Sequence, residues 1–144
     1  MYLSIDPGDE RSGWARFDAT GTSTGHGILY GKESLYNLLF EEGEKNPLIS
    51  LMICEDYKLF DFAAKAQSWS KLSTVRLIGS IEYWCHYNGV ELVLDPPVNL
   101  IMGAMYSGMK KPKGHCPDDL SAYFHGVYVL QQRGIRKPQQ MAGK

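Results

Sequence analysis

The sequence predicts an α/β fold, in which helices flank a five-stranded mixed sheet made of an antiparallel meander and two parallel strands. Two observations favour this fold. Short strand-like runs separated by turn residues fill the first thirty positions, and later apolar runs alternate with segments of helical periodicity. A meander followed by strands that helices separate indicates a mixed sheet with helices packed on it.

The bulk composition is that of one globular domain. The chain has 144 residues, of which 44% are hydrophobic and 22% charged. We assign residues 1–133 to the domain and residues 134–144 to a flexible C-terminal tail. Three cysteines without paired metal-binding spacing predict reduced thiols and a cytoplasmic location. The chain shows no signal-peptide pattern and no run of 18 apolar residues, so we expect no contact with a membrane.

The predicted meander occupies the N-terminal part of the chain. Residues 2–6 read as a buried strand, residues 12–18 alternate as a second strand, and residues 26–31 form a third. Turn residues separate them, around Gly8 and in the Thr- and Gly-rich stretch at 20–25. Consecutive strands joined by such short turns are expected to pair antiparallel.

Helices and apolar strands alternate in the middle of the chain. A short helix is predicted over 33–42, and the almost wholly apolar segment 48–54 suits a central strand covered on both faces. A long helix is expected within 61–87, followed by a short strand at 90–94 that two prolines end.

The last third is expected to be helical around one polar loop. A helical piece is predicted over 98–106, a loop rich in Gly, Lys and Pro over 107–117, and a final helix over 118–132. Apolar residues in this last helix recur with the spacing of one helix face. They are Leu120, Tyr123, Phe124, Val127 and Tyr128.

Charge is distributed unevenly along the chain. The net charge is −1, which by itself argues weakly against nucleic-acid binding. Residues 1–60 contain ten acidic and five basic residues, whereas residues 104–144 contain seven basic and two acidic ones. A polyanion responds to such local fields rather than to the average.

Asp6 and Glu55 each end an apolar run, and both have two interpretations. Asp6 can be part of a turn, and Glu55 with Asp56 can mark the exit of a strand into water. Alternatively, both bind a metal, because acids at strand ends are costly unless a cation gathers them and Mg²⁺ prefers carboxylate oxygens. Gly8 and Gly13 favour the second interpretation, since glycine lets a polyanionic backbone approach closely.

A second acidic group opens the last predicted helix. Asp118 and Asp119 stabilise a helix N-terminus through its free amides and dipole, which is one interpretation. The other is metal binding by one of the two. His115 precedes Asp118 by three residues, so both can face one site, and this makes His115 a better candidate than the other three histidines.

Five basic residues are candidates for DNA contacts. Lys110, Lys111 and Lys113 form either an ordinary solvated loop or a set of phosphate contacts, which position a nucleic-acid backbone without reading its sequence. Lys65 and Arg76 on the long helix extend this track in the second interpretation.

Four segments in chain order also carry a family resemblance. They are Ile5-Asp6-Pro7-Gly8 with Gly13, Ile53-Cys54-Glu55 followed by Tyr57 and Phe60, Val75-Arg76-Leu77-Ile78-Gly79, and His115-Cys116-Pro117-Asp118. Together they resemble the motifs of RuvC-like Holliday junction resolvases, within the ribonuclease H-like superfamily, over roughly residues 2–131. The small size and the unusual loops resemble phage-encoded members more than cellular ones.

The resemblance implies a ribonuclease H-like nuclease domain that cuts four-way DNA junctions by paired symmetric nicks. It implies that Asp6, Glu55 and Asp118 hold two Mg²⁺ ions, with Mn²⁺ able to substitute, and that His115 is a further ligand or handles protons. It also implies a homodimer with paired sites. Another branched DNA or an RNA–DNA hybrid as substrate, and a non-catalytic DNA-binding module, are the alternatives.

The chain departs from the family pattern at two places. Asp119 stands where these proteins usually carry a small apolar residue, so either Asp118 or Asp119 is the expected metal ligand. The lysine-rich loop does not follow the usual Gly-rich basic segment, which bears on junction specificity more than on nuclease chemistry.

Overall fold

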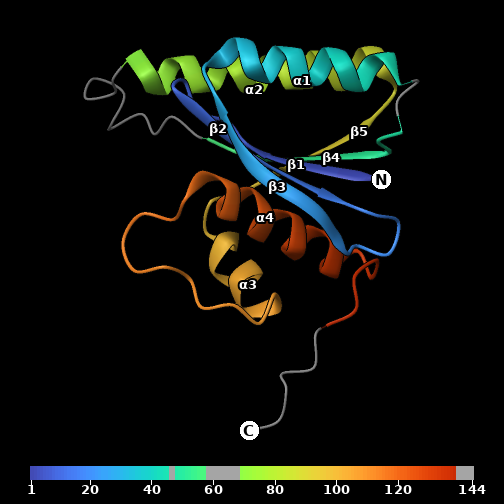
Figure 1. The fold of residues 1–144 in the computed structure, drawn as a ribbon, viewed down its shortest axis with the longest axis vertical. Coiled ribbons are helices and arrows are strands. Elements are labelled where there is room, and N and C mark those ends of the chain that lie inside the picture. Colours follow the sequence, from blue (N-terminus) through green and yellow to red (C-terminus); the bar gives the residue numbers. More distant parts are fainter. Residues whose placement is uncertain (46–47, 58–68, 139–144) are drawn as a thin grey trace, which may run out of the picture.

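A five-stranded mixed sheet forms the centre of the computed structural model, which describes residues 1–45, 48–57 and 69–138 (Figure 1). The strand order is β3-β2-β1-β4-β5; β1, β2 and β3 pair antiparallel, and β4 and β5 continue the sheet in parallel with β1. The predicted α/β sheet of a meander plus two parallel strands is confirmed. The strands are β1 Tyr2–Asp6, β2 Arg11–Phe17, β3 Ser23–Tyr30, β4 Leu51–Glu55 and β5 Glu91–Asp95.

Helices cover both faces of this sheet (Figure 1). On one face lie α1 (Lys32–Glu44) and α2 (Trp69–Asn88); on the other lies α4 (Asp118–Gln132), with α3 (Asn99–Tyr106) packed against it. The described part of the chain contains no helix long and apolar enough to span a membrane.

The core has one apolar cluster on each side of the sheet. Leu3, Ile5 and Met52 face α1 and α2, whereas Phe17 and Ile53 face α4. Central strands β1 and β4 are therefore buried on both faces, as parallel strands between helix layers usually are. The three cysteines are also buried, with free thiols.

Most element boundaries agree with the prediction, and the last helix agrees at both ends. The third strand, predicted at 26–31, begins at Ser23, because β2 pairs as far as Phe17 with Ser23. The turn before it is closed by Asp18, whose Oδ1 accepts hydrogen bonds from the amides of Thr20 and Thr22.

The other strands and the long helix differ by a few residues. β4 begins at Leu51 rather than 48, and β5 extends to Asp95 rather than 94. The part of the predicted long helix at 61–68 lies outside the described residues.

Packed structure continues past the predicted domain boundary at residue 133. Ile135 packs against the apolar cluster under α4, and Arg136 is buried and donates a hydrogen bond from Nη1 to the carbonyl of Gly21 at 2.8 Å. These two side chains therefore pack against the domain, and the division of the chain at residue 133 stays a prediction.

Candidate active site

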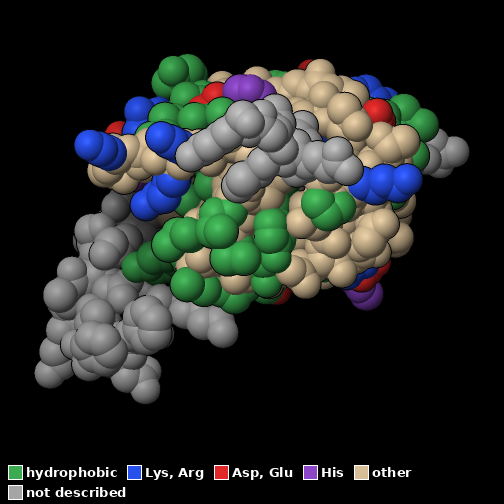
Figure 2. Space-filling view, turned by 90° about the horizontal axis from the view of Figure 1, so that it is seen from below, with side chains coloured by type: hydrophobic (Ala, Val, Ile, Leu, Met, Phe, Trp, Pro, Cys, Tyr) green, Lys and Arg blue, Asp and Glu red, His purple; other side chains and the backbone are tan. Residues whose placement is uncertain are grey.

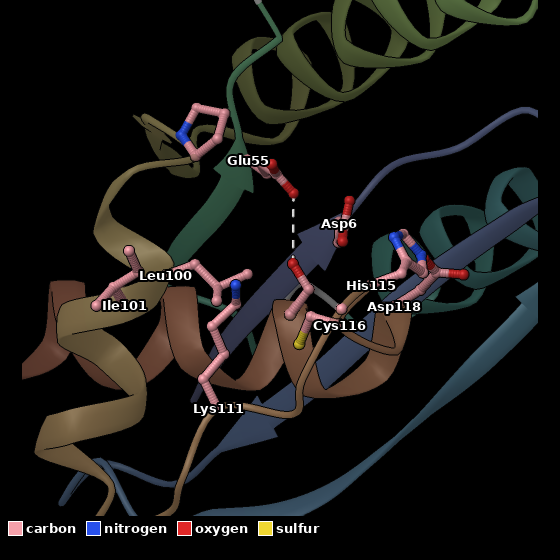
Figure 3. A pocket seen from close by; sticks show the side chains of 11 residues that line it. Asp6, Glu55, Leu100, Ile101, Lys111, His115, Cys116 and Asp118 are labelled. Atoms are coloured by element: carbon pink, nitrogen blue, oxygen red, sulfur yellow. Dashed lines mark hydrogen bonds and ion pairs between the residues drawn. The ribbon is translucent and has the colours of Figure 1, made fainter.

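A pocket of about 420 Å³ lies where β1 and β4 end and α4 begins (Figure 3). Five of the residues selected from the sequence line it, namely Asp6, Glu55, Lys111, His115 and Asp118. Residues that are far apart in the chain thus meet in one place, at the carboxyl ends of parallel strands, where α/β sheets commonly bind ligands.

Asp6 and Glu55 project side by side from the ends of β1 and β4 (Figure 3). The two strands are parallel neighbours, with Ile5 paired to Cys54, so the next residue of each strand reaches the same edge. The two carboxyl groups lie close enough for each to perturb the pKa of the other. Their proximity therefore follows from the strand register.

The two acids have strongly perturbed protonation. Burial raises the pKa of Asp6 above its ordinary value. Burial, and then the negative charge of Asp6, raises the pKa of Glu55 from 4.5 to about 9. At neutral pH the pair therefore keeps a proton, because two buried carboxylates cannot both ionise without a nearby cation.

Asp118 enters the pocket from the first turn of α4. Its Oδ2 lies 3.2 Å from Arg11 Nε, and its Oδ1 lies 3.7 Å from Nε2 of His115, whose side chain is 79% exposed. Asp118 is therefore contacted by the Arg11 guanidinium and the His115 ring on the outer side of the pocket, whereas Asp6 and Glu55 face each other.

The donor set fits a divalent cation in kind. Carboxylate oxygens are the ligands that Mg²⁺ prefers, and a proton shared by two buried acids is what a metal ion would replace. Within the described residues, no three His, Cys, Asp or Glu side chains lie close enough together to form a ready-made metal site. Asp6 and Glu55 are the adjacent pair that would hold the ion, and Asp118 is the third acid of the same pocket.

Gly13 explains how α4 comes so close to Asp6. It is paired with Asp6 across β1 and β2, and a Cβ atom at this position would lie 1.8 Å from the carbonyl oxygen of Asp118. The prediction that Gly13 admits a polyanionic backbone is therefore corrected, because the backbone it admits is that of the protein itself.

Asp119 faces away from this pocket. Its Oδ2 lies 2.9 Å from Nδ1 of His26 on β3, and it is not among the pocket residues. Adjacent residues of a helix point about 100° apart, so Asp118 and Asp119 cannot face the same site. Of the two candidate ligands, the geometry favours Asp118.

The predicted basic residues are dispersed. Lys111 lines the pocket, whereas Lys110, Lys113 and Arg76 are outside its lining. Lys65 lies outside the described residues. Figure 2 shows Lys and Arg side chains beside an apolar patch on the face that carries α3. Exposed side chains of α3 and its flanks belong to this side, among them Val98, Ile101, Met102, Met105 and Met109.

Three further residues, one lining the pocket and two behind it, are absent from the sequence-based candidates. Ser121 Oγ donates a hydrogen bond to Glu55 Oε2 at 3.4 Å. His125 is fully buried between Asp95, whose Oδ2 lies 2.5 Å from Nδ1, and Glu55, whose Oε2 lies 3.7 Å from Nε2. The sequence does hold a signal for two of them, because Ser121 and His125 follow Asp118 by three and seven residues and therefore share its helix face.

Known structures resemble this chain in fold. Thermus thermophilus RuvC in complex with Holliday junction substrate aligns with a TM-score of 0.64 and 12% identity, over 95% of this chain and 98% of that one. A second Thermus thermophilus RuvC structure aligns with a TM-score of 0.57 and 13% identity, over 95% of this chain and 98% of that one. Fowlpox virus resolvase, in a complex with Holliday junction DNA, aligns with a TM-score of 0.51 and 14% identity, over 92% of this chain and 97% of that one.

The sequence itself matches no family model and no curated protein. At 12–14% identity the structural likeness establishes the fold, which is the predicted ribonuclease H-like fold.

Proposed function

We propose that this protein is a metal-dependent endonuclease that resolves four-way DNA junctions. The observation that carries the proposal is the Asp6–Glu55 pair, two adjacent carboxyl groups in a pocket that Asp118 and Lys111 also line. The fold, which it shares with two proteins solved on Holliday junction DNA, supports the choice of substrate.

Five of the pocket residues have a role in this proposal. Asp6, Glu55 and Asp118 would hold two Mg²⁺ ions, for which Mn²⁺ could substitute. When bound, the ions supply an activated water and positive charge at the departing 3′ oxygen, leaving a 5′-phosphate and a 3′-hydroxyl. Lys111 would contact the phosphate in the pocket. His115, exposed beside Asp118, would exchange protons with solvent at the mouth or act as a further ligand.

DNA outside the pocket would be bound through its phosphates. Lys110 and Lys113 belong to the loop that carries Lys111, and Arg76 is exposed on α2. Lys65 stays a predicted contact. Phosphate contacts of this kind release counterions, so affinity for any DNA should fall steeply as salt increases.

Paired nicks need two active sites, so we propose a homodimer. A groove of about 390 Å³ between α1 and α2 supports this choice. Large aromatic side chains stand exposed along it, with Phe40 exposed by 68%, Tyr83 by 69% and Tyr87 by 77%. Apolar surface of this kind marks protein contact sites more often than free surface.

The test is incubation of the protein with a labelled mobile four-way junction and Mg²⁺. We expect symmetric, ligatable nicks in opposite strands, and no nicks from the Asp6→Asn variant, which should still bind the junction. Glu41→Gln, an exposed carboxylate change on α1, serves as the control. Flaps, duplexes and RNA–DNA hybrids are tested in parallel. Preferred cutting of one of these would replace the junction as substrate, and absence of any cutting by the wild type would refute the nuclease.

A further inference from the structure

The side chains behind Glu55 form a chain of buried polar contacts. Asn99, at the start of α3, donates from Nδ2 to Asp95 Oδ1 at 2.7 Å. The other oxygen of Asp95 lies 2.5 Å from His125 Nδ1, and His125 Nε2 lies 3.7 Å from Glu55 Oε2. Each contact fixes the next, and the last one reaches the acid that the proposed function requires.

This chain is built inside the protein rather than on its surface. The His125 side chain is 0% exposed and that of Asp95 is 4% exposed. His125 Nε2 has no hydrogen-bond partner in the described part of the chain, although it faces the Glu55 carboxyl. Burying an imidazole and a carboxylate is unfavourable unless they are satisfied, so packing alone gives no reason for them here.

The geometry assigns a direction to the imidazole ring. Asp95 Oδ2 accepts a hydrogen bond from Nδ1 of His125. This bond sets the rotation of the ring, so that Nε2 faces Glu55. Ser121 Oγ contacts the same Glu55 oxygen. Oε2 of Glu55 is therefore contacted by both Ser121 and His125 on the side away from the pocket mouth. Histidine–carboxylate pairs of this kind commonly orient metal-binding groups in proteins.

We propose that Asp95 and His125 are positioning residues that hold the Glu55 carboxylate in its metal-binding orientation. This inference rests on the proposed function only in that it takes Glu55 as a metal ligand. Neither residue lines the pocket, so neither is proposed to contact DNA or the reacting atoms.

The test measures Mg²⁺ affinity without DNA, from the Mg²⁺-dependent rise in melting temperature and from calorimetric titration. Asp95→Asn keeps the shape of the side chain, and His125→Leu removes the ring nitrogens. We expect each to weaken Mg²⁺ binding by about 10- to 100-fold. His125→Gln should lose less, because its amide can still meet Glu55, and His86→Leu, an exposed histidine on α2, should lose nothing.

The two positions should also be coupled. If Asp95 acts through His125, the double variant Asp95→Asn/His125→Leu should bind Mg²⁺ no worse than His125→Leu alone. Folded variants with wild-type Mg²⁺ affinity would overturn the inference, as would a wild type that binds no Mg²⁺. If His125→Leu does not fold, Asp95→Asn and His125→Gln decide.

The same variants separate this inference from the proposed function. A wild type that binds Mg²⁺ tightly but nicks no DNA would refute the nuclease and leave the positioning role standing. A wild type that nicks junctions, with Asp95→Asn and His125→Gln unchanged in both Mg²⁺ affinity and nicking rate, would refute only the positioning role.

Discussion

The two helix layers pack against the sheet in different ways. On the α4 side, backbone atoms and rings approach glycines so closely that a Cβ would clash, as at Gly13, Gly126 and Gly103. On the α1–α2 side, aliphatic side chains fill the interface, and a Cβ at Gly79 of α2 would have no atom within 4 Å. Close approach fixes the pocket residues relative to the strands, whereas the opposite layer keeps an open aromatic groove.

Each helix layer also lies beside a carboxylate, buried Glu42 on one side and half-buried Glu55 on the other, with opposite outcomes. Glu42 of α1 is 2% exposed and forms salt bridges with Arg16 and Lys45. Glu55 meets Asp6 instead, and its pKa rises to about 9 through burial and that neighbouring charge. Glu42 is thus neutralised by two basic side chains, whereas Glu55 lies beside another acid and would be stabilised by a bound cation. Perturbed pKa values of this kind are common at functional sites.

The largest expected effect separates two adjacent acids of the α4 layer by activity. Asp118→Asn should remove a metal ligand and several kcal/mol of transition-state stabilisation, on the order of a 10³-fold loss of nicking rate. Asp119→Asn should keep most of the activity, since this side chain contacts His26. Single-turnover nicking of a four-way junction measures both. Equal losses of nicking rate in the two variants would show that the contact of Asp119 with His26 does not prevent Asp119 from acting as a metal ligand.

The next effect tests the close packing itself. A Cβ at Gly126 would lie 2.3 Å from Cε2 of Phe17, which is fully buried and stacks on Tyr123. Gly126→Ala should destabilise the fold by about 3 kcal/mol. Gly79→Ala, in the open on α2, should instead stabilise it by about 1 kcal/mol, because alanine is the better helix former. Urea unfolding of both variants decides, and similar free energies of unfolding would remove the contrast between the layers.

Glu55 should make the stability of the protein depend on pH. The pKa of Glu55 is raised by folding, so between pH 4.5 and 9 the folded protein holds a proton that the unfolded chain has lost. Metal-free protein should therefore lose stability as pH rises, by at most about 1.4 kcal/mol per pH unit. Glu55→Gln should remove this dependence, and added Mg²⁺ should restore stability at high pH.

Glu42→Gln provides the matched comparison for that experiment. It removes the partner of Arg16 and should destabilise the protein across the neutral pH range. Melting temperatures in a chelating buffer at several pH values measure both variants. If the Glu55→Gln protein still loses stability as pH rises, the pH dependence does not come from Glu55 but from another group.

The smallest effect concerns the surface of the α4 layer. Arg133 follows α4 and forms two contacts with Glu91 of β5, at 2.6 and 3.0 Å, and both side chains are more than a third exposed. Arg133→Ala should cost only about 0.5 kcal/mol in unfolding free energy. A cost comparable to that of Gly126→Ala would mean that ion pairing, rather than close packing, attaches this layer.

Sequence pattern predicts the features of this protein that depend on local periodicity. The stripe from Leu120 to Tyr128 defines α4 at both ends, and the rule that parallel strands end at one edge brings Asp6 and Glu55 together from the sequence alone. The roles of Asp95 and His125 require tertiary information. Asp95 falls just beyond the predicted strand. His125 lies between apolar core residues of α4, where the sequence gives no reason to read a histidine as anything but a core side chain.

The role of Gly13 is also beyond sequence reasoning. Glycine indicates that something comes close, but the identity of the approaching group depends on how α4 is placed, and that is set by residues about a hundred positions later. The packing of Arg136 is beyond sequence reasoning for a similar reason, because its hydrogen bond goes to the distant carbonyl of Gly21.

That last contact has a practical consequence for handling the protein. The 15 residues of α4 span roughly 22 Å, with Asp118 at the pocket and Gln132 at the opposite end. Since Arg136 anchors its segment beside Gly21, a label attached at the exposed Lys137 would lie at the end of the domain remote from the acids. Single-molecule or surface-immobilised assays can therefore tether the chain there while leaving the mouth of the pocket open to a large substrate.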